Sequence, residues 1–317
     1  MGAFTVTTNA NTAVVLTVEM RIISPRRPAI QAPLFNVIRA LAVNRGSGWV
    51  GCCAATILVA LVLVGCVGQS PRPFPAQPDR WLNIEAFELA VFEKDGTDSG
   101  FLHIYLDGDG RPVDPVRLTP SVDPTPRDAL VLELMNRDPS PSVYLGRPCY
   151  FRPDAPPCHS DLWTGARYGP RVVATLCAAV QQLAAEADRP VTVIGFSGGG
   201  ALAVLVANCA ESVSRIVTIN GNLDTALWAG MRGFIPLQGS LNPVDVGLPE
   251  RVTTRIYLVG ENDPVVPPEV SARFSESVPG RLIALPDFTH ACCWIDAWTE
   301  LLADIDGAGL RPLPQTE

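Results

Sequence analysis

One serine lies in a sequence setting that is typical of a catalytic nucleophile. Gly195-Phe196-Ser197-Gly198-Gly199 fits the pattern G-x-S-x-G, in which the serine sits on a sharp turn between a strand and a helix. The apolar run VTVIGF precedes the motif and the small-residue run ALAVLVANCA follows it. Flanking glycines avoid the clashes that a Cβ would create in such a turn. The pattern predicts Ser197 as nucleophile and the Gly198 N–H, at a helix N-terminus, as an oxyanion donor; the alternative is a structural turn that contains a serine.

A serine nucleophile needs a general base, and the chain has three histidines. His103 lies within an apolar run and His159 in a Pro-rich segment, and both precede Ser197. His290 is the only histidine after Ser197, and it follows the apolar run RLIAL. Where the serine occupies a strand-to-helix turn of this kind, the order along the chain is serine, acid, histidine. We therefore predict His290 as the base.

The acid that orients the histidine should follow a strand between these two residues. Asp263 does so in the segment GENDPVVPP, directly after the apolar run IYLV. Asp224, in NGNLD after the preceding apolar run, is the rival candidate. Asp263 is favoured because the role requires a carboxylate on a loop beside that of His290. Asp287, three residues before His290, is more typical of a turn.

These segments resemble the α/β-hydrolase superfamily, in which the loop G-x-x-D-x-x-V-P is common and is similar to GENDPVVPP. The resemblance covers about residues 82–305. The segments YLDGDG, YLGRPC, NLD, SLNP and FTHACCW resemble a bacterial branch of exported serine hydrolases without an assigned substrate. The resemblance implies a second oxyanion donor, the backbone N–H of Asp109 or of an adjacent glycine. Gly108 stands here where many esterases carry a histidine.

The elements that would position these residues alternate along the chain between short apolar runs and helical patterns. This alternation predicts an α/β-hydrolase fold, with a mostly parallel central sheet and helices on both faces, in one domain over residues 81–312. The expected strands are 82–93 (a strand or hairpin), 101–106, 142–145, 191–196, 215–219, 254–259 and 281–285. The expected helices are 126–136, 168–187, 201–209 and 293–305. Residues 222–251, with Trp228, Phe234 and Pro236, could form a small lid or pack ordinarily.

Composition excludes several other classes of protein. The 317 residues are 47% hydrophobic and 18% charged, which is typical of a globular chain. The net charge of −8 provides no basic footprint for nucleic acid. No CxxC or HExxH pattern occurs, so we expect no metal site and no cofactor.

The N-terminal part reads as an export signal. Residues 49–67 carry no charge and follow an arginine-rich stretch, which favours a cytoplasmic start and an exported remainder. Leu63-Val64-Gly65-Cys66 resembles the bacterial lipobox, so we expect lipid attachment at Cys66; an uncleaved anchor or ordinary secretion are the alternatives. The predicted organisation is a leader over 1–48, the apolar segment with the lipobox over 49–66, and a Pro-rich tether over 67–80; a true start downstream of residue 1 is the alternative for the leader.

Six of the nine cysteines fall in the predicted exported domain. An even number in an oxidising compartment suggests disulfides, and six cysteines allow 15 pairings. Cys149 and Cys158 bracket a short loop and are the favoured pair. Cys292 and Cys293 flank the His290 loop, and we expect one of them to pair with a distant cysteine.

The expected function is hydrolysis of an ester, thioester or amide through an acyl-enzyme, most simply as a carboxylesterase acting on a small-molecule acyl substrate. A peptidase fits less well, since no large gating insertion is apparent. The alternative from another class is an inert, envelope-associated binding lipoprotein on the same scaffold. The fold alone does not identify the substrate.

Overall fold

The computed structural model describes Phe74, residues 77–97 and residues 100–306. The predicted leader, the apolar segment, Cys66 and residues 307–312 of the predicted domain lie outside the described residues, as does most of the tether. Arg80, which we expected to end the tether, is instead the first residue of a strand. No helix in the described part combines the length and apolar character needed to cross a membrane.

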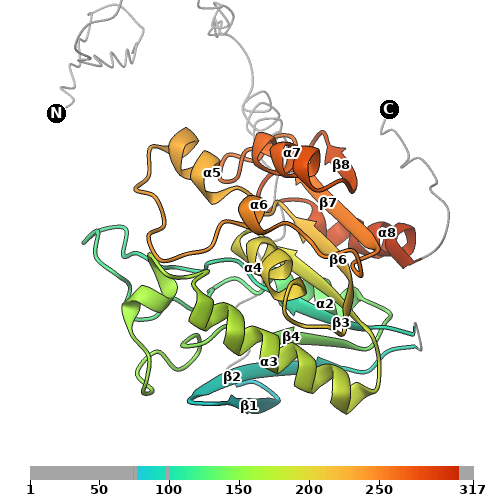
Figure 1. Ribbon diagram of the computed structural model, residues 1–317, viewed down its shortest axis with the longest axis horizontal. Helices are drawn as coiled ribbons and strands as arrows, with labels where there is room; N and C mark the ends of the chain where they lie inside the picture. Colours follow the sequence, from blue (N-terminus) through green and yellow to red (C-terminus); the bar gives the residue numbers. More distant parts are fainter. Residues whose placement is uncertain (1–73, 75–76, 98–99, 307–317) are drawn as a thin grey trace, which may run out of the picture. The chain divides into compact units, whose positions relative to one another are not determined.

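The described residues form one sheet of eight strands in the order β1-β2-β4-β3-β5-β6-β7-β8 (Figure 1). β1 pairs with β2, and β2 with β4, in antiparallel register, whereas all the other neighbouring strands are parallel. Strands buried on both faces are continuously apolar, which explains runs such as VTVIGF. The bounds are β1 Arg80–Ile84, β2 Phe87–Lys94, β3 Leu102–Leu106, β4 Ser142–Leu145, β5 Val191–Phe196, β6 Val213–Ile219, β7 Thr254–Gly260 and β8 Arg281–Leu285.

Helices cover both faces of this sheet (Figure 1). One core contains Ile104, Val193 and Ile216 of the sheet together with α3 (Pro170–Ala187), α4 (Gly198–Ala207) and α7 (Pro268–Ser277). The second core, on the other face, contains the next residues of the same strands together with α2 (Leu130–Arg137) and α8 (Trp294–Asp306). Successive strand residues point to opposite faces, so each strand contributes to both cores.

The expected strands and helices are present, with shifted ends. The run 82–93 is a hairpin of two strands, β1 and β2. Helix α4 begins at Gly198, three residues earlier than predicted, and α2 begins at Leu130, four residues later. Four short elements were not predicted: the 3₁₀ turn Ser160–Trp163, α5 (Thr225–Arg232), α6 (Pro243–Val246) and α7. The predicted lid region therefore contains α5 and α6.

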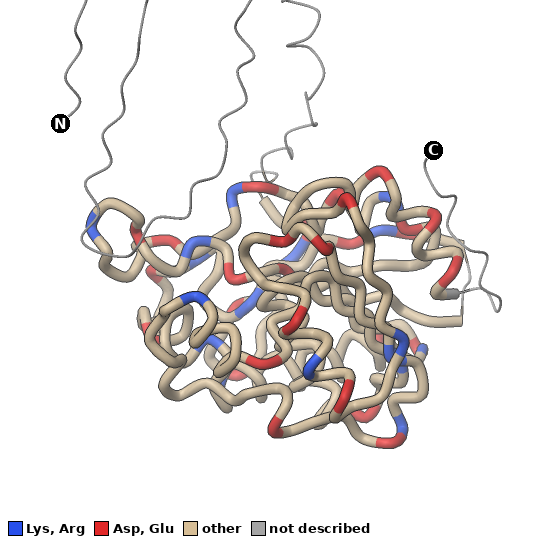
Figure 2. The backbone as a smooth tube through the Cα atoms, turned by 90° about the horizontal axis from the view of Figure 1, so that it is seen from above, with Lys and Arg blue, Asp and Glu red and all other residues tan. Residues whose placement is uncertain are grey.

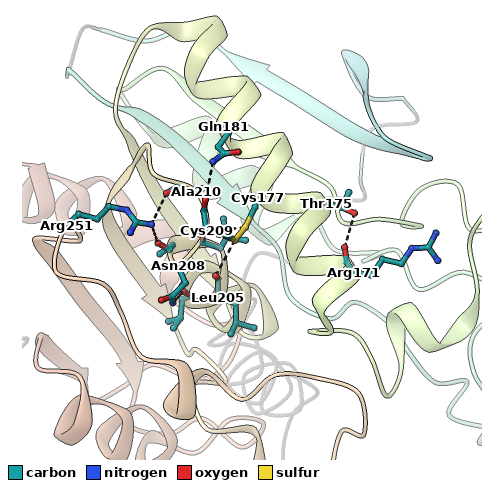
Figure 3. Close-up of a disulfide and its surroundings, with 12 residues drawn as sticks. Arg171, Thr175, Cys177, Gln181, Leu205, Asn208, Cys209, Ala210 and Arg251 are labelled. Atoms are coloured by element: carbon teal, nitrogen blue, oxygen red, sulfur yellow. Dashed lines mark hydrogen bonds between the residues drawn. A yellow bond between two sulfur atoms is a disulfide. The ribbon is translucent and has the colours of Figure 1, made fainter.

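Three disulfides are present among the described residues. Cys149 pairs with Cys158, the pair that the sequence favoured. Cys177 of α3 pairs with Cys209 just after α4, and Figure 3 shows their sulfur atoms lying between these two segments. Cys292 and Cys293 pair with each other, so the expectation of a distant partner was wrong. The reason is that the four remaining cysteines of the domain are already paired among themselves.

Candidate active site

Ser197 occupies the turn between β5 and α4 with φ 53° and ψ −119°. A positive φ is rare for a residue with a Cβ, and such backbone strain concentrates at functional sites. The turn is held by hydrogen bonds from Ser197 N to Ile219 O, 2.8 Å, and from Asn222 N to Ser197 O, 3.0 Å. A Cβ on Gly199 would lie 2.1 Å from the carbonyl oxygen of Leu106. The glycines are therefore required because neighbouring backbone passes directly beside the turn.

The turn presents backbone donors beside the serine. Gly198 is the first residue of α4, and the first N–H groups of a helix have no partner within it. Gly108 lies against the serine, since a Cβ added to it would be 3.4 Å from the Cβ of Ser197. The Gly108 N–H is engaged by the carboxylate of Asp107 at 2.6 Å. The resemblance implied a second oxyanion donor at Asp109 or an adjacent glycine. With the Gly108 N–H engaged, the backbone N–H groups of Asp109 and Gly110 remain as candidates.

His290 and Asp263 are in direct contact. The Nδ1 atom of His290 lies 2.7 Å from Oδ2 of Asp263, whose side chain is fully buried. The other carboxylate oxygen, Oδ1, accepts the N–H groups of Val265 and Val266 at 2.7 and 3.0 Å. The imidazole ring also packs against Phe196, the residue before the serine, with ring centroids 4.8 Å apart. The aspartate is thus fixed by backbone donors while it orients the histidine.

Asp224, the rival acid, has other partners. Its Oδ1 accepts the Leu227 N–H at 3.0 Å and so caps α5. Its Oδ2 forms an ion pair with Arg273 at 3.1 Å. An aspartate with these contacts stabilises a helix N-terminus. The structure brings Asp263, and not Asp224, to His290.

A buried asparagine that the sequence analysis missed holds the histidine loop against the sheet. Asn220 follows β6, and its Nδ2 donates to the carbonyl oxygens of Thr289 and His290 at 3.1 and 3.2 Å. Its Oδ1 accepts the N–H of Gly260 at the end of β7. One side chain therefore connects the ends of two strands to the histidine loop. The sequence signal for Asn220 was its position directly after a strand, in the same loop as Asp224.

The side chain of Asp109 forms a largely buried ionic cluster, which the sequence analysis also missed. Its two oxygens accept hydrogen bonds from Arg147 and Arg167, each at 2.8 Å, and from the hydroxyl of Tyr168 at 2.7 Å. Burial alone would raise the pKa of Asp109, but the two guanidinium charges outweigh it and lower the pKa to about 2. A Cβ on Gly198 would lie 2.0 Å from this carboxylate. The cluster thus packs directly behind the proposed oxyanion donor.

Asp107 differs from Asp109 in its electrostatics. Burial raises the pKa of Asp107 to about 6, and the hydrogen bonds from Gly108 N–H and the Tyr144 hydroxyl only partly offset this effect. Arg147 donates to the carbonyl oxygen of Asp107, not to its carboxylate. Two aspartates separated by one residue therefore have pKa values displaced in opposite directions.

The site opens into a cavity of about 630 Å³. Ser197 and His290 both line it, together with the segments that contain Asp109 and Leu130. Trp228 of α5 contributes to another part of the lining and donates its indole N–H to Val265 O at 2.9 Å. The predicted lid region thus supplies part of the pocket through Trp228.

The other two histidines lie elsewhere. His103 is fully buried in β3, where its Nδ1 lies 2.7 Å from Asp138. The hydroxyl of Tyr105 also donates to this carboxylate, at 2.6 Å. His159 is exposed and precedes the 3₁₀ turn. Neither histidine lines the cavity.

No protein-family model matches the sequence, and no curated protein matches it. The structure is similar to that of a puromycin-hydrolysing peptidase from Mycobacterium tuberculosis, with a TM-score of 0.51 and 16% identity, over 71% of this chain and 38% of that one. The chain thus spans well under half the length of that protein. A putative hydrolase from Agrobacterium vitis is also similar, with a TM-score of 0.49 and 14% identity over 71% of this chain and 96% of that one.

The structural similarity to the puromycin-hydrolysing peptidase agrees with the strand order and with the helices on both faces of the sheet. The chain has the α/β-hydrolase fold, as the sequence predicted. At this level of identity the likeness concerns the fold alone.

Proposed function

We propose that this protein is a serine hydrolase that cleaves a carboxylic ester, thioester or amide through an acyl-enzyme, with Ser197, His290 and Asp263 as its triad. The observation that carries the proposal is the 2.7 Å contact between His290 and Asp263, with His290 and the strained Ser197 lining one cavity. Each member of this arrangement corresponds to a role in acyl transfer.

In the proposed reaction, His290 takes the proton of the Ser197 hydroxyl as the oxygen attacks the substrate carbonyl carbon. Asp263 holds the Nδ1–H tautomer and stabilises the imidazolium that forms. The Gly198 N–H and a donor from the 109–110 segment stabilise the tetrahedral oxyanion. His290 then protonates the leaving group, and water, activated by the same histidine, hydrolyses the acyl-enzyme.

An ester is the substrate that we expect to be cleaved fastest, because an alkoxide is a better leaving group than an amide nitrogen. The test is hydrolysis of p-nitrophenyl esters of increasing acyl length by wild type and by Ser197→Ala. Wild type should hydrolyse at least one ester, and Ser197→Ala should lose the activity by orders of magnitude while keeping its fold. Equal rates for the two proteins would remove Ser197 from the mechanism, and a folded wild type that cleaves none of them would favour the inert binding protein.

We also propose that the domain is exported and attached to a membrane through lipid on Cys66. Three disulfides support export, because disulfides persist in oxidising compartments. The lipobox-like Leu63-Val64-Gly65-Cys66 supports the site of attachment. The intact mass of protein extracted from membranes tests this proposal: a mature N-terminus at Cys66 with acyl mass is expected, and a different N-terminus contradicts it.

A further inference from the structure

Arginines gather around the cavity that holds Ser197. Arg111, Arg127 and Arg167 line it, and Arg147 lies behind it against Asp109. Over the described residues, cationic and anionic residues are interspersed (Figure 2), and the net charge of the full sequence is −8. Three aspartates, Asp107, Asp109 and Asp128, line the same cavity, so the hydrogen bonds that each charged group can still make decide what the cavity binds.

Arg167 is nine-tenths buried and has hydrogen-bonding capacity to spare. Its Nε donates to Thr164 O at 2.7 Å and its Nη1 to Asp109 at 2.8 Å. Its Nη2 makes no hydrogen bond to the described residues. If this nitrogen were fully buried, it would be a buried polar atom without a partner, and it is not one of those atoms. Nη2 is therefore accessible. Because Arg167 lines the cavity, this nitrogen can donate to a bound molecule.

Asp109, the carboxylate bonded to Arg167, has no comparable capacity. Both of its oxygens already accept hydrogen bonds, from Arg147, Arg167 and Tyr168. Asp107 is buried, and its oxygens accept from Gly108 N–H and from the Tyr144 hydroxyl. A guanidinium only donates hydrogen bonds, so the free Nη2 of Arg167 requires an accepting atom, such as an oxygen, on the ligand.

Two further arginines, Arg111 and Arg127, line the cavity. Together with Arg167 they face three lining carboxylates, Asp107, Asp109 and Asp128, so the ionised lining residues carry no net charge. An anion would therefore be recognised by individual guanidinium donors and not by an excess of positive charge. Neither Arg111 nor Arg127 forms an ion pair with a side chain in the described part of the chain. Two guanidinium groups are therefore available at this cavity besides Arg167.

We infer that the substrate of the proposed hydrolase carries an anionic group, a carboxylate or a phosphate, which is bound by Arg111, Arg127 and the Nη2 of Arg167. This inference rests on the proposed function and specifies its substrate class. Guanidinium groups present N–H donors in a planar fork that matches carboxylate and phosphate oxygens. The remaining lining includes Leu130, Phe196 and Trp228, which suit a hydrocarbon portion. The expected substrate is an ester with both an apolar and an anionic part.

Two pairs of esters test the inference on the full chain. The first pair is the p-nitrophenyl ester of adipic acid, which keeps a free carboxylate, and its neutral methyl ester. The second is a 1-acylglycerol 3-phosphate and the corresponding 1-acylglycerol. We expect kcat/KM to favour the anionic member of at least one pair by about tenfold or more, since hydrogen bonds to charged groups are among the strongest in proteins. The pair with the preference distinguishes a carboxylate from a phosphate.

Substitutions connect the preference to the arginines. Arg111→Gln and Arg127→Gln should each lower the ratio of anionic to neutral kcat/KM several-fold, and the ratio for wild type should fall as salt is added. Arg171→Gln is the matched control, because Arg171 is exposed on α3 and does not line the cavity. It should leave the ratio unchanged. A fall in the ratio for Arg171→Gln equal to that for Arg127→Gln would mean that general electrostatics, not the cavity, sets the preference.

The outcomes separate this inference from the proposed function. Cleavage of both members of each pair at similar rates, or faster cleavage of the neutral members, overturns the anionic substrate and leaves the serine hydrolase standing. If none of the four esters is cleaved, adipate and 1,6-hexanediol are compared as protectants of Ser197 against a fluorophosphonate. Stronger protection by adipate supports the anion site, and equal protection overturns it. A Ser197 that no fluorophosphonate labels contradicts the proposed function itself.

Discussion

At the scale of single residues, the partners of each carboxylate distinguish one aspartate from another. Asp263 and Asp224 both follow strands, and the sequence allowed either to be the acid. Asp263 is bonded to His290 and to two backbone N–H groups, whereas Asp224 is bonded to Leu227 N–H and Arg273. The first set of contacts orients an imidazole, and the second stabilises a helix.

Asp263→Asn and Asp224→Asn should therefore differ in kind. Asparagine at 263 cannot stabilise the imidazolium or hold the required tautomer, so kcat should fall strongly, by up to about 10⁴-fold as in the best-studied triad. Asparagine at 224 keeps an oxygen for the helix cap, so kcat should change little and the melting temperature should fall modestly. Steady-state kinetics on the purified variants tests this ranking. A larger loss of kcat for Asp224→Asn would assign the acid to the earlier loop.

Asp107 leads to a prediction about pH. Its pKa in the folded protein is raised to about 6, whereas an exposed aspartate titrates near 4. Because its pKa is higher in the folded protein, protonated Asp107 adds to the free energy of unfolding. This contribution is fully present below pH 4 and is lost as the pH rises to about 6, because ionisation then favours the unfolded chain. Asp107→Asn removes this effect. Between pH 4 and pH 7, wild type should lose about 2 kcal/mol of unfolding free energy relative to the variant, as measured by urea denaturation. A constant difference would show that Asp107 titrates normally.

At the scale of elements, the site depends on the close approach of β3, β5 and α4. The glycines at 198–200 disfavour a helix by intrinsic propensity, which is why the predicted start of α4 was too late. In the structure these positions contact the backbone that follows β3 and the loop after β6, so the tertiary contact decides the conformation. Helix α7 was missed because only Val270, Ser271 and Phe274 are buried, which is too weak a stripe to recognise.

Gly199→Ala tests the close approach. Its Cβ would lie 2.1 Å from the Leu106 carbonyl oxygen, so backbone must shift and the unfolding free energy should fall by about 3 kcal/mol. Gly230→Ala is the matched control, since nothing lies within 4 Å of its Cβ in α5. It should be neutral, or stabilising by up to about 1 kcal/mol. Thermal unfolding of both variants measures the difference, and equal effects would contradict the packing that we describe for the serine turn.

At the scale of the whole molecule, the sequence predicted the features that depend on local motifs and missed those that depend on contacts between distant segments. The sequence predicted the strand before Ser197, the serine turn and the order serine, acid, histidine. This was possible because parallel strands bring their carboxyl ends to one edge of the sheet. The Asp109 cluster could not be predicted. Its partners Arg147, Arg167 and Tyr168 are 38, 58 and 59 residues away along the chain, and no periodicity connects them.

The central claim, that Ser197 is an activated nucleophile, is tested most directly by its reaction with a fluorophosphonate. This reagent modifies a serine whose hydroxyl is activated by a neighbouring base. Intact-mass measurement followed by peptide mapping should find one adduct per chain, on Ser197, in the wild-type protein. Ser197→Ala should take up none, and labelling of Asp263→Asn should be strongly slowed. No adduct on a folded wild-type chain, or an adduct on another residue with Ser197 unmodified, would contradict the account.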